Sequence, residues 1–292
     1  MRKVTFAAIQ FACSWNREAN IAKAKELVRQ AAAKGANAIL IQELFETPYF
    51  CQDQCVDHFG LAAPFEGNPL IATMAELASE LRVVLPISFF EKAGQAHFNS
   101  LAMIDADGSV LGLYRKSHIP DGPGYQEKYY FTPGDTGFKV FRTRFGMFGA
   151  GICWDQWFPE SARAMALTGA EALFYPTAIG TEPPPAAPVD SRDHWRRVMQ
   201  GHAGANVMPL IASNRIGTEK GQQGSEITFY GSSFVADHQG AIVAELDRDH
   251  EGVTTASFDL DEIQKARASW GIFRDRRPEL YGPIGGHDGR AV

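Results

Sequence analysis

The amino-acid sequence predicts an α/β fold in which two apposed sheets carry helices on their outer faces. Two observations indicate this fold. Apolar stretches of strand length alternate with amphipathic helical stretches both before and after roughly residue 140, and each half of the chain also contains a hairpin. No linker or low-complexity run separates the halves. We therefore expect a single domain over residues 1–292, with a C-terminal tail from about 271 to 292.

The first half begins with a predicted strand over residues 4–11 and a predicted helix over 16–34, in which apolar residues recur at helical spacing. Gly35 follows at the position where glycine commonly ends a helix. The other elements expected here are a wholly apolar strand over 38–41, a helix over 69–81, a strand over 82–90 and a hairpin of 97–104 with 110–114 across Asp107-Gly108.

The second half follows a long loop over residues 115–137, which contains glycines and prolines. Strands over 138–141 and 147–152 are expected to pair across a turn, and a helix is expected from Pro159 until Gly169 stops it. Further along we expect a strand at 172–175, a stiff four-proline loop at 181–190, a helix at 191–207, a strand at 210–214, a hairpin of 231–236 with 241–246, a strand at 253–258 and a helix at 260–269.

Composition excludes several classes of function. The net charge of −6 does not favour nucleic acid as a partner. No uncharged apolar stretch approaches the ~20 residues that span a bilayer, and Gln10 interrupts the one N-terminal run that resembles a signal peptide. The four cysteines form no disulfide framework, which fits a reducing cytoplasm. Cys51, Cys55 and His58 lack a fourth metal ligand, so we expect neither a metal nor a cofactor.

Polar residues follow three predicted strands at the point where each strand ends. Glu43 comes directly after the apolar residues 39–41, Lys116 follows the strand ending at Tyr114-Arg115, and Cys153 precedes the turn into the Pro159 helix. Buried charges are costly unless they are paired, so these three residues make sense if they meet. The alternatives are a surface ion pair for Glu43 and Lys116, and a small buried hydrophobic role for Cys153.

If the three residues meet, acid–base chemistry assigns each a role. The Cys153 thiol becomes a strong nucleophile once a base takes its proton or a cation lowers its pKa. Glu43 can accept that proton and later activate water, while Lys116 can keep Glu43 ionised and stabilise an oxyanion. The backbone amide of Trp154, which we also expect to border the substrate, can supply a second oxyanion donor.

Three segments, 42–44, 114–120 and 151–155, resemble the three signature blocks of the nitrilase superfamily of carbon–nitrogen hydrolases, and the similarity extends over essentially the whole chain. The resemblance implies a four-layer α-β-β-α sandwich and homo-oligomers that associate through the outer helices. It also implies that Glu43, Lys116 and Cys153 form the catalytic triad. A second active-site glutamate is expected after the lysine block, where Glu127 is the best match and Asp121 is a rival.

Segments 122–128 and 190–197 resemble members of this family that hydrolyse small N-carbamoyl amines. The expected reaction is attack of Cys153 on the ureido carbon, loss of ammonia, and hydrolysis to a carbamate that decomposes to carbon dioxide and amine. One alternative is a sister hydrolase that acts on a carbamoyl amino acid or a linear amide. The other is a non-catalytic scaffold with a vestigial triad.

A carbamoyl diamine also carries an ammonium group, whose recognition calls for a carboxylate with aromatic or hydroxyl help. Glu182 in the four-proline loop is the expected partner, with Asp190 and Asp193 following it, and Tyr125 is expected to be a wall or a hydroxyl donor. The alternative for Glu182 is a solvated loop carboxylate. An inward-facing arginine would instead favour a carboxylate substrate, and the three arginines considered are Arg192, Arg196 and Arg197.

Overall fold

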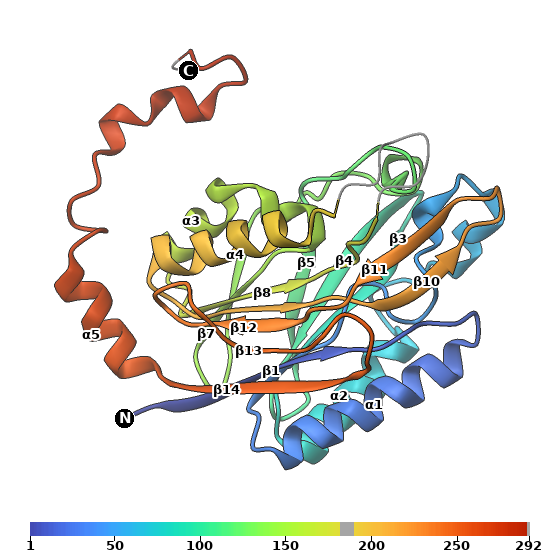
Figure 1. Cartoon of the computed structure of the whole chain (residues 1–292), viewed down its shortest axis with the longest axis horizontal. Coiled ribbons are helices and arrows are strands. Elements are labelled where there is room, and N and C mark those ends of the chain that lie inside the picture. Colours follow the sequence, from blue (N-terminus) through green and yellow to red (C-terminus); the bar gives the residue numbers. More distant parts are fainter. Residues whose placement is uncertain (182–189, 291–292) are drawn as a thin grey trace.

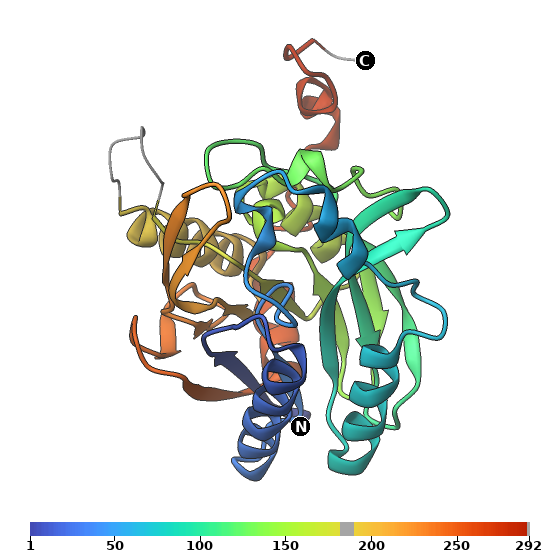
Figure 2. The ribbon, with the colours of Figure 1, turned by 90° about the vertical axis from the view of Figure 1, so that its right-hand side faces the viewer.

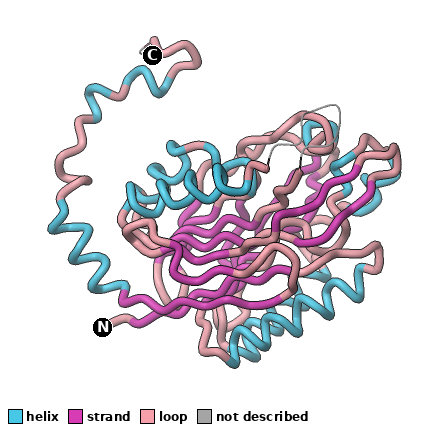
Figure 3. Tube along the Cα trace, in the orientation of Figure 1, coloured by secondary structure: helices cyan, strands magenta, loops and turns pink. Residues whose placement is uncertain are grey.

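The computed structural model describes residues 1–181 and 190–290, and it confirms the predicted sandwich. The strands lie in the middle of the molecule and helices cover both outer faces (Figure 3). Helices α1 (Arg17–Ala33) and α2 (Pro69–Leu81) lie on one side, and α3 (Pro159–Leu167) and α4 (Arg192–Asn206) lie on the other (Figure 1). The helix boundaries agree with the predicted ones to within two residues.

The first sheet has the strand order β14-β1-β2 continued by β3-β4-β5. Backbone hydrogen bonds from Ile39 N to Val84 O (3.0 Å) and from Val84 N to Asn37 O (2.8 Å) join the two groups of three strands. The strands are β14 (Gly252–Asp259), β1 (Lys3–Gln10), β2 (Ala38–Leu40), β3 (Leu85–Ala93), β4 (Ala96–Ile104) and β5 (Val110–Arg115).

The second sheet has the order β13-β12-β9-β8-β7-β6, with β7, β8 and β9 parallel and their neighbours antiparallel. The strands are β6 (Lys139–Arg142), β7 (Met147–Ala150), β8 (Ala172–Pro176), β9 (Leu210–Ser213), β12 (Phe234–Ala236) and β13 (Ile242–Glu245). The carboxyl ends of β2 and β5 in one sheet and of β7 in the other carry the residues singled out above.

Three apolar clusters correspond to the three interfaces between the four layers. In β1, Ala7 and Ile9 belong to the cluster under α1 and α2, whereas Phe6 and Ala8 belong to the cluster between the two sheets. This assignment follows from the two-residue period of a strand, which sends successive side chains to opposite faces. The third cluster, which includes Trp195 of α4, lies between the second sheet and α3 and α4.

Some strand boundaries differ from the sequence prediction, and one hairpin was missed; β7 ends at Ala150 rather than residue 152, and β12 begins at Phe234 rather than residue 231. Strand β3 begins at Leu85 rather than near residue 82, because Arg82 ends α2 in the left-handed conformation (φ 57°). A hairpin of β10 (Ile216–Lys220) and β11 (Glu226–Tyr230) was not predicted at all. In β10 the buried residue Glu219 is charged, so this strand lacks apolar alternation, whereas β11 alternates, with Ile227 and Phe229 buried between polar residues.

Helix α5 (Leu260–Trp270) ends at Gly271, whose φ of 77° provides the left-handed C-terminal position. Residues 271–290 then extend away from the sandwich and pass the side that carries α3 and α4 (Figures 1 and 2). Large apolar side chains on and beside this tail are exposed to solvent: Trp270, Leu280 and Ile284. Within the described parts of the chain, no helix is both long enough and apolar enough to cross a membrane.

Candidate active site

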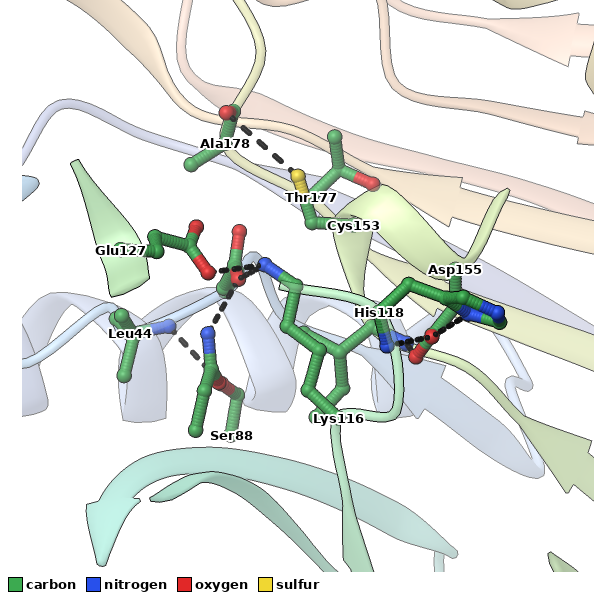
Figure 4. A network of polar contacts seen from close by, with 12 residues as sticks. Leu44, Ser88, Lys116, His118, Glu127, Cys153, Asp155, Thr177 and Ala178 are labelled. Carbon is green, nitrogen blue, oxygen red and sulfur yellow. Dashed lines mark hydrogen bonds and ion pairs between the residues drawn. The ribbon is translucent and has the colours of Figure 1, made fainter. Parts of the chain in front are cut away.

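Glu43, Lys116 and Glu127 meet in a fully buried cluster. Lys116 Nζ lies 3.0 Å from Glu43 Oε1 and 2.6 Å from Glu127 Oε2, and none of the three side chains is exposed. Figure 4 shows Lys116 reaching Glu127 close to Cys153. The geometry therefore excludes the alternative of a surface ion pair for Glu43 and Lys116. Glu127 is thus the second glutamate that contacts Lys116, whereas Asp121, the other candidate for that position, is exposed.

The two oxygens of the Glu43 carboxylate differ in their partners. Oε1 accepts hydrogen bonds from Lys116 Nζ and from Asn99 Nδ2, the latter at 2.6 Å. Oε2 is buried and has no hydrogen-bond partner among the described residues. A buried acceptor without a donor costs on the order of 1–3 kcal/mol. This cost is expected where a reacting group supplies the missing donor, so Oε2 is the oxygen suited to act as a base.

Electrostatic interactions keep Lys116 charged. Burial opposes its charged form, but the carboxylates of Glu127 and Glu43 outweigh that effect and hold the pKa of Lys116 well above its usual range. Burial, together with the nearby Glu43 charge, raises the pKa of Glu127 to about 7 although Lys116 opposes the shift. The hydroxyl of Tyr49 donates to Glu127 Oε1 at 2.6 Å. The cluster therefore combines the Lys116 cation with two buried carboxyl groups, and the pKa of Glu127 is raised.

Cys153 occupies the first position of the short 3₁₀ turn Cys153–Trp157 and has a left-handed backbone (φ 42°). Such a conformation is uncommon for a side chain with a Cβ and is concentrated at functional sites. The thiol contacts the carbonyl oxygen of Ala178 at 3.8 Å. Burial and the Glu43 charge raise the pKa of Cys153 well above its ordinary value despite Lys116. The thiol is therefore protonated at neutral pH and needs a base to react.

Asp155 ties the lysine segment to the cysteine segment (Figure 4). Its Oδ2 accepts hydrogen bonds from the Tyr114 hydroxyl (2.6 Å) and from Ile152 N (2.9 Å). Its Oδ1 accepts from His118 N at 2.9 Å and lies 2.7 Å from His118 Nδ1. The buried carboxylate thus fixes the backbone on one side of Cys153 and the loop that begins at Lys116.

Several supporting residues were not predicted from the sequence. Asn99, Tyr49 and Asp155 contact the cluster or its loops as described above. Arg215 is fully buried, donates to the carbonyl oxygens of Glu43 (2.8 Å) and Leu44 (3.2 Å), and pairs with Glu219 at 2.8 Å. One signal was available in the sequence, because Asp155 follows two residues after Cys153, at the end of an apolar run. The other residues lie in strands or loops far away in the chain.

A pocket of about 340 Å³ opens over Cys153. Tyr125 and Trp154 both line it, and the Tyr125 hydroxyl accepts a hydrogen bond from Gly180 N at 3.0 Å. The lining residues in the described part of the chain include one carboxylate, Asp121, and no lysine or arginine. The pocket therefore suits a neutral reacting group joined to a cationic end better than an anionic substrate.

Of the three carboxylates considered as partners of a substrate ammonium, the two that the structure describes do not line this pocket. Glu182 lies outside the described residues. Asp190 pairs with Arg248 at 2.6 Å and Asp193 pairs with Arg192 at 3.2 Å, so both carboxylates already have cationic partners. Arg192 and Arg196 also pair with Glu245, at 2.9 and 2.8 Å, and neither they nor Arg197 line the pocket over Cys153. The described arginines thus do not provide a site for a substrate carboxylate.

Cys51, Cys55 and His58 do not form a metal site in the structure. Cys51 is fully buried in an apolar cluster, and His58 lies 3.3 Å from the Tyr130 hydroxyl. Within residues 1–181 and 190–290, no group of three or more histidine, cysteine, aspartate or glutamate side chains is arranged to hold a metal ion. All four cysteines are free.

The sandwich and the buried glutamate–lysine–cysteine cluster define a class of hydrolase, and comparison with known proteins identifies it. The family model of carbon–nitrogen hydrolases matches residues 5–268, and the chain belongs to this family. It is therefore an amidohydrolase. Its structure is similar to that of a carbon–nitrogen hydrolase from Helicobacter pylori G27, with a TM-score of 0.91, 39% identity and coverage of 98% of this chain and 99% of that one.

Two curated relatives are more similar in sequence. The N-carbamoylputrescine amidase of Arabidopsis thaliana is 64% identical over 285 residues, which cover 96% of this chain and 94% of that protein. The citrullinase of Francisella tularensis is 52% identical over 284 residues, which cover 97% of this chain and 99% of that protein. Both relatives align with nearly the whole chain.

Proposed function

We propose that this enzyme hydrolyses N-carbamoylputrescine to putrescine, ammonia and carbon dioxide, a step in polyamine synthesis from agmatine. The observation that carries the proposal is the free Glu43 Oε2 within a buried lysine–carboxylate–thiol cluster beneath a pocket whose described lining has a carboxylate and no cation. The similarity to the Arabidopsis amidase supports the choice of substrate.

In the first half-reaction, Glu43 Oε2 takes the thiol proton and Cys153 Sγ attacks the ureido carbon. Lys116 and the backbone amide of Trp154 stabilise the oxyanion that develops on the ureido oxygen. The carbon–nitrogen bond to the terminal amino group then breaks, and this group leaves as ammonia after receiving the proton from Glu43. The product is a thiocarbamate on Cys153 that still carries the aminobutyl chain.

In the second half-reaction, Glu43 removes a proton from water, which attacks the same carbon. The carbon–sulfur bond breaks and the proton returns to Sγ. The released carbamate decomposes to carbon dioxide and putrescine. Because one base serves both steps, the rates of both half-reactions depend on Glu43. Glu127 holds Lys116 in place through the 2.6 Å contact, and its ionised form places a negative charge next to the Lys116 ammonium group.

A panel of three ureido substrates tests the assignment: N-carbamoylputrescine, citrulline and N-carbamoyl-β-alanine. Ammonia release measured at equal substrate concentrations should be fastest with N-carbamoylputrescine, because the other two compounds present a carboxylate to a pocket whose described lining has no lysine or arginine. Faster release from citrulline would assign the enzyme to the activity named for its Francisella relative.

The carboxylate that binds the substrate ammonium is proposed to be Glu182, with Asp121, which lines the pocket, as the other candidate. Substitution of the residue that binds the ammonium should lower kcat/KM for N-carbamoylputrescine, and the loss should correspond to roughly 2–3 kcal/mol of transition-state stabilisation. It should have little effect on a neutral carbamoyl alkylamine. Glu182→Gln and Asp121→Asn measured on both substrates distinguish the two candidates, and equal losses on both substrates would exclude either residue.

We also propose that the enzyme is a cytoplasmic homo-oligomer. The four free cysteines support a reducing compartment. A groove of about 730 Å³ between α3, α4 and the tail supports self-association, because Leu167, Tyr281 and Ile284 line it and are exposed. Exposed apolar surface of this kind often marks an interface between proteins.

A further inference from the structure

Asn99 contacts two members of the cluster, the side chain of Glu43 and the backbone of Lys116. It lies in β4, its side chain is fully buried, and its Nδ2 donates to Glu43 Oε1 at 2.6 Å. Its backbone oxygen accepts a hydrogen bond from Lys116 N at 2.8 Å. One residue of the sheet therefore holds the side chain of the glutamate and the backbone of the lysine.

The Asn99 hydrogen bond makes the two oxygens of Glu43 unequal. Oε1 receives donors from both Lys116 and Asn99, whereas Oε2 receives none from the described residues. With Lys116 as the only donor, the carboxylate would be held through a single contact and could rotate about its last bond. Two donors on the same oxygen fix the plane of the carboxylate and leave the other oxygen with its full capacity to accept a proton.

We propose that Asn99 is a positioning residue for this reaction, which fixes the Glu43 carboxylate so that Oε2 serves as the base. The proposal rests on the function proposed above. It goes beyond that function because Asn99 contributes no group to the reaction itself and acts only through Glu43. Loss of the amide should therefore slow the chemical steps and leave substrate binding nearly unchanged.

The next residue in β4 provides a matched control. Ser100 is also fully buried, and its Oγ donates to Glu91 Oε2 at 2.6 Å. Since successive strand residues point to opposite faces, Ser100 serves the Glu91–Arg115 ion pair rather than Glu43. Asn99→Leu and Ser100→Ala each remove one buried hydrogen bond to a carboxylate from the same strand, so their costs in stability should be similar.

The experiment compares kcat, KM and the rate of Cys153 alkylation by iodoacetamide in Asn99→Leu, Ser100→Ala and Glu43→Gln. Asn99→Leu should lower kcat by roughly 10-fold to 100-fold, the loss expected for a charged hydrogen bond. Its KM should stay within about threefold, and alkylation should slow in parallel because it also requires removal of the thiol proton. Ser100→Ala should keep both rates within about twofold. The hydrogen bond that it removes joins Ser100 to Glu91, and neither residue contacts Glu43.

The outcomes separate the two levels of the proposal. If Glu43→Gln is inactive while Asn99→Leu retains its kcat, or if Ser100→Ala loses as much activity as Asn99→Leu, the role of Asn99 is wrong and the proposed function stands. Substantial activity in Glu43→Gln would overturn the role of Glu43 as the base and with it the role of Asn99, whereas a wild type that does not hydrolyse N-carbamoylputrescine would overturn the proposed function. If circular dichroism shows that Asn99→Leu does not fold, Asn99→Ser is measured in its place, because its shorter side chain lacks the reach to Glu43 and should show the same loss.

Discussion

At the scale of single residues, burial together with the Glu43 charge decides the protonation of Cys153, whereas the two carboxylates decide that of Lys116. Cys153 is a neutral thiol because desolvation and the Glu43 charge outweigh Lys116. In the proposed mechanism Lys116 therefore does not activate the thiol by itself, and attack requires proton transfer from Cys153 to Glu43. Lys116, held between two carboxylates, is available to stabilise the oxyanion.

The raised pKa of Glu127 predicts how stability changes with pH. Its pKa rises from 4.5 in a solvated chain to about 7 in the fold, so the folded state binds this proton more tightly. The stability that the protonated form contributes is complete below pH 4.5 and is lost as the pH rises towards 7. The free energy of unfolding of the wild type, relative to Glu127→Gln, should therefore decrease between those two values.

Urea unfolding of both proteins at several pH values measures this difference. A difference that increases with pH would show that Lys116 lowers the pKa of Glu127 below its solvated value. A constant difference would show that Glu127 does not titrate in this range.

At the scale of elements, three loops that follow strands carry the cluster, and their close packing leaves no room for larger residues. Gly134 N donates to Lys116 O at 2.8 Å, and a Cβ at Gly134 would lie 2.1 Å from Arg115 O. The glycine is needed because the backbone of residues 115 and 116 passes against it. The loop over 115–137 is therefore held against the end of β5 by its own later residues.

Gly134→Ala should displace Lys116 and lower kcat by on the order of 10-fold or more, because small displacements of catalytic groups are costly. The matched change is Gly201→Ala in α4, where an added Cβ would meet no atom within 4 Å. That change should leave kcat unaltered and raise stability by about 0.5–1 kcal/mol. Steady-state kinetics and thermal unfolding of both variants check the prediction, and full activity in Gly134→Ala would contradict it.

The sequence predicted those helices and strands in which apolar residues recur at a regular spacing. The prediction failed where a buried residue is polar and depends on a partner from elsewhere in the chain. The strands β2 and β7, which precede Glu43 and Cys153, are recognisable because they are short and wholly apolar and because polar residues follow them. Strand β10 of the β10–β11 hairpin was not recognisable, since its buried residue Glu219 is charged and depends on Arg215 and on the backbone amide of Tyr49 as partners. Asn99 was equally hidden, because its partner Glu43 lies 56 positions away in the chain.

At the scale of the whole molecule, the four layers of the sandwich bury apolar side chains at three interfaces, whereas the apolar side chains late in the tail, residues 271–290, stay exposed. Leu280 and Ile284 remain 62% and 61% exposed. Phe273, by contrast, contacts the guanidinium groups of Arg163 and Arg267, at 4.9 and 5.7 Å from the ring centre. The first turn of the tail therefore belongs to the sandwich, and the part beyond it is free to pack against a second copy.

Removal of residues 276–292 keeps the Phe273 contacts and tests this role. We expect the full chain to sediment well above its monomer mass of 32.0 kDa at micromolar concentration, and the shortened chain to sediment as a smaller species. The double variant Leu280→Asp and Ile284→Asp should have the same effect without shortening the chain. A full-length protein that sediments as a monomer would contradict the proposed oligomer.

The central claim is that Cys153 carries the reaction, and the simultaneous measurement of ammonia and putrescine released from N-carbamoylputrescine tests it most directly. The wild type and the control Cys55→Ser should release the two products in equal amounts, and Cys153→Ala should release neither while remaining folded. Mass spectrometry of the wild type quenched during turnover should find the (4-aminobutyl)carbamoyl adduct, which retains the aminobutyl chain, on the peptide that contains Cys153. Release of both products by folded Cys153→Ala at a rate near that of the wild type would contradict the account.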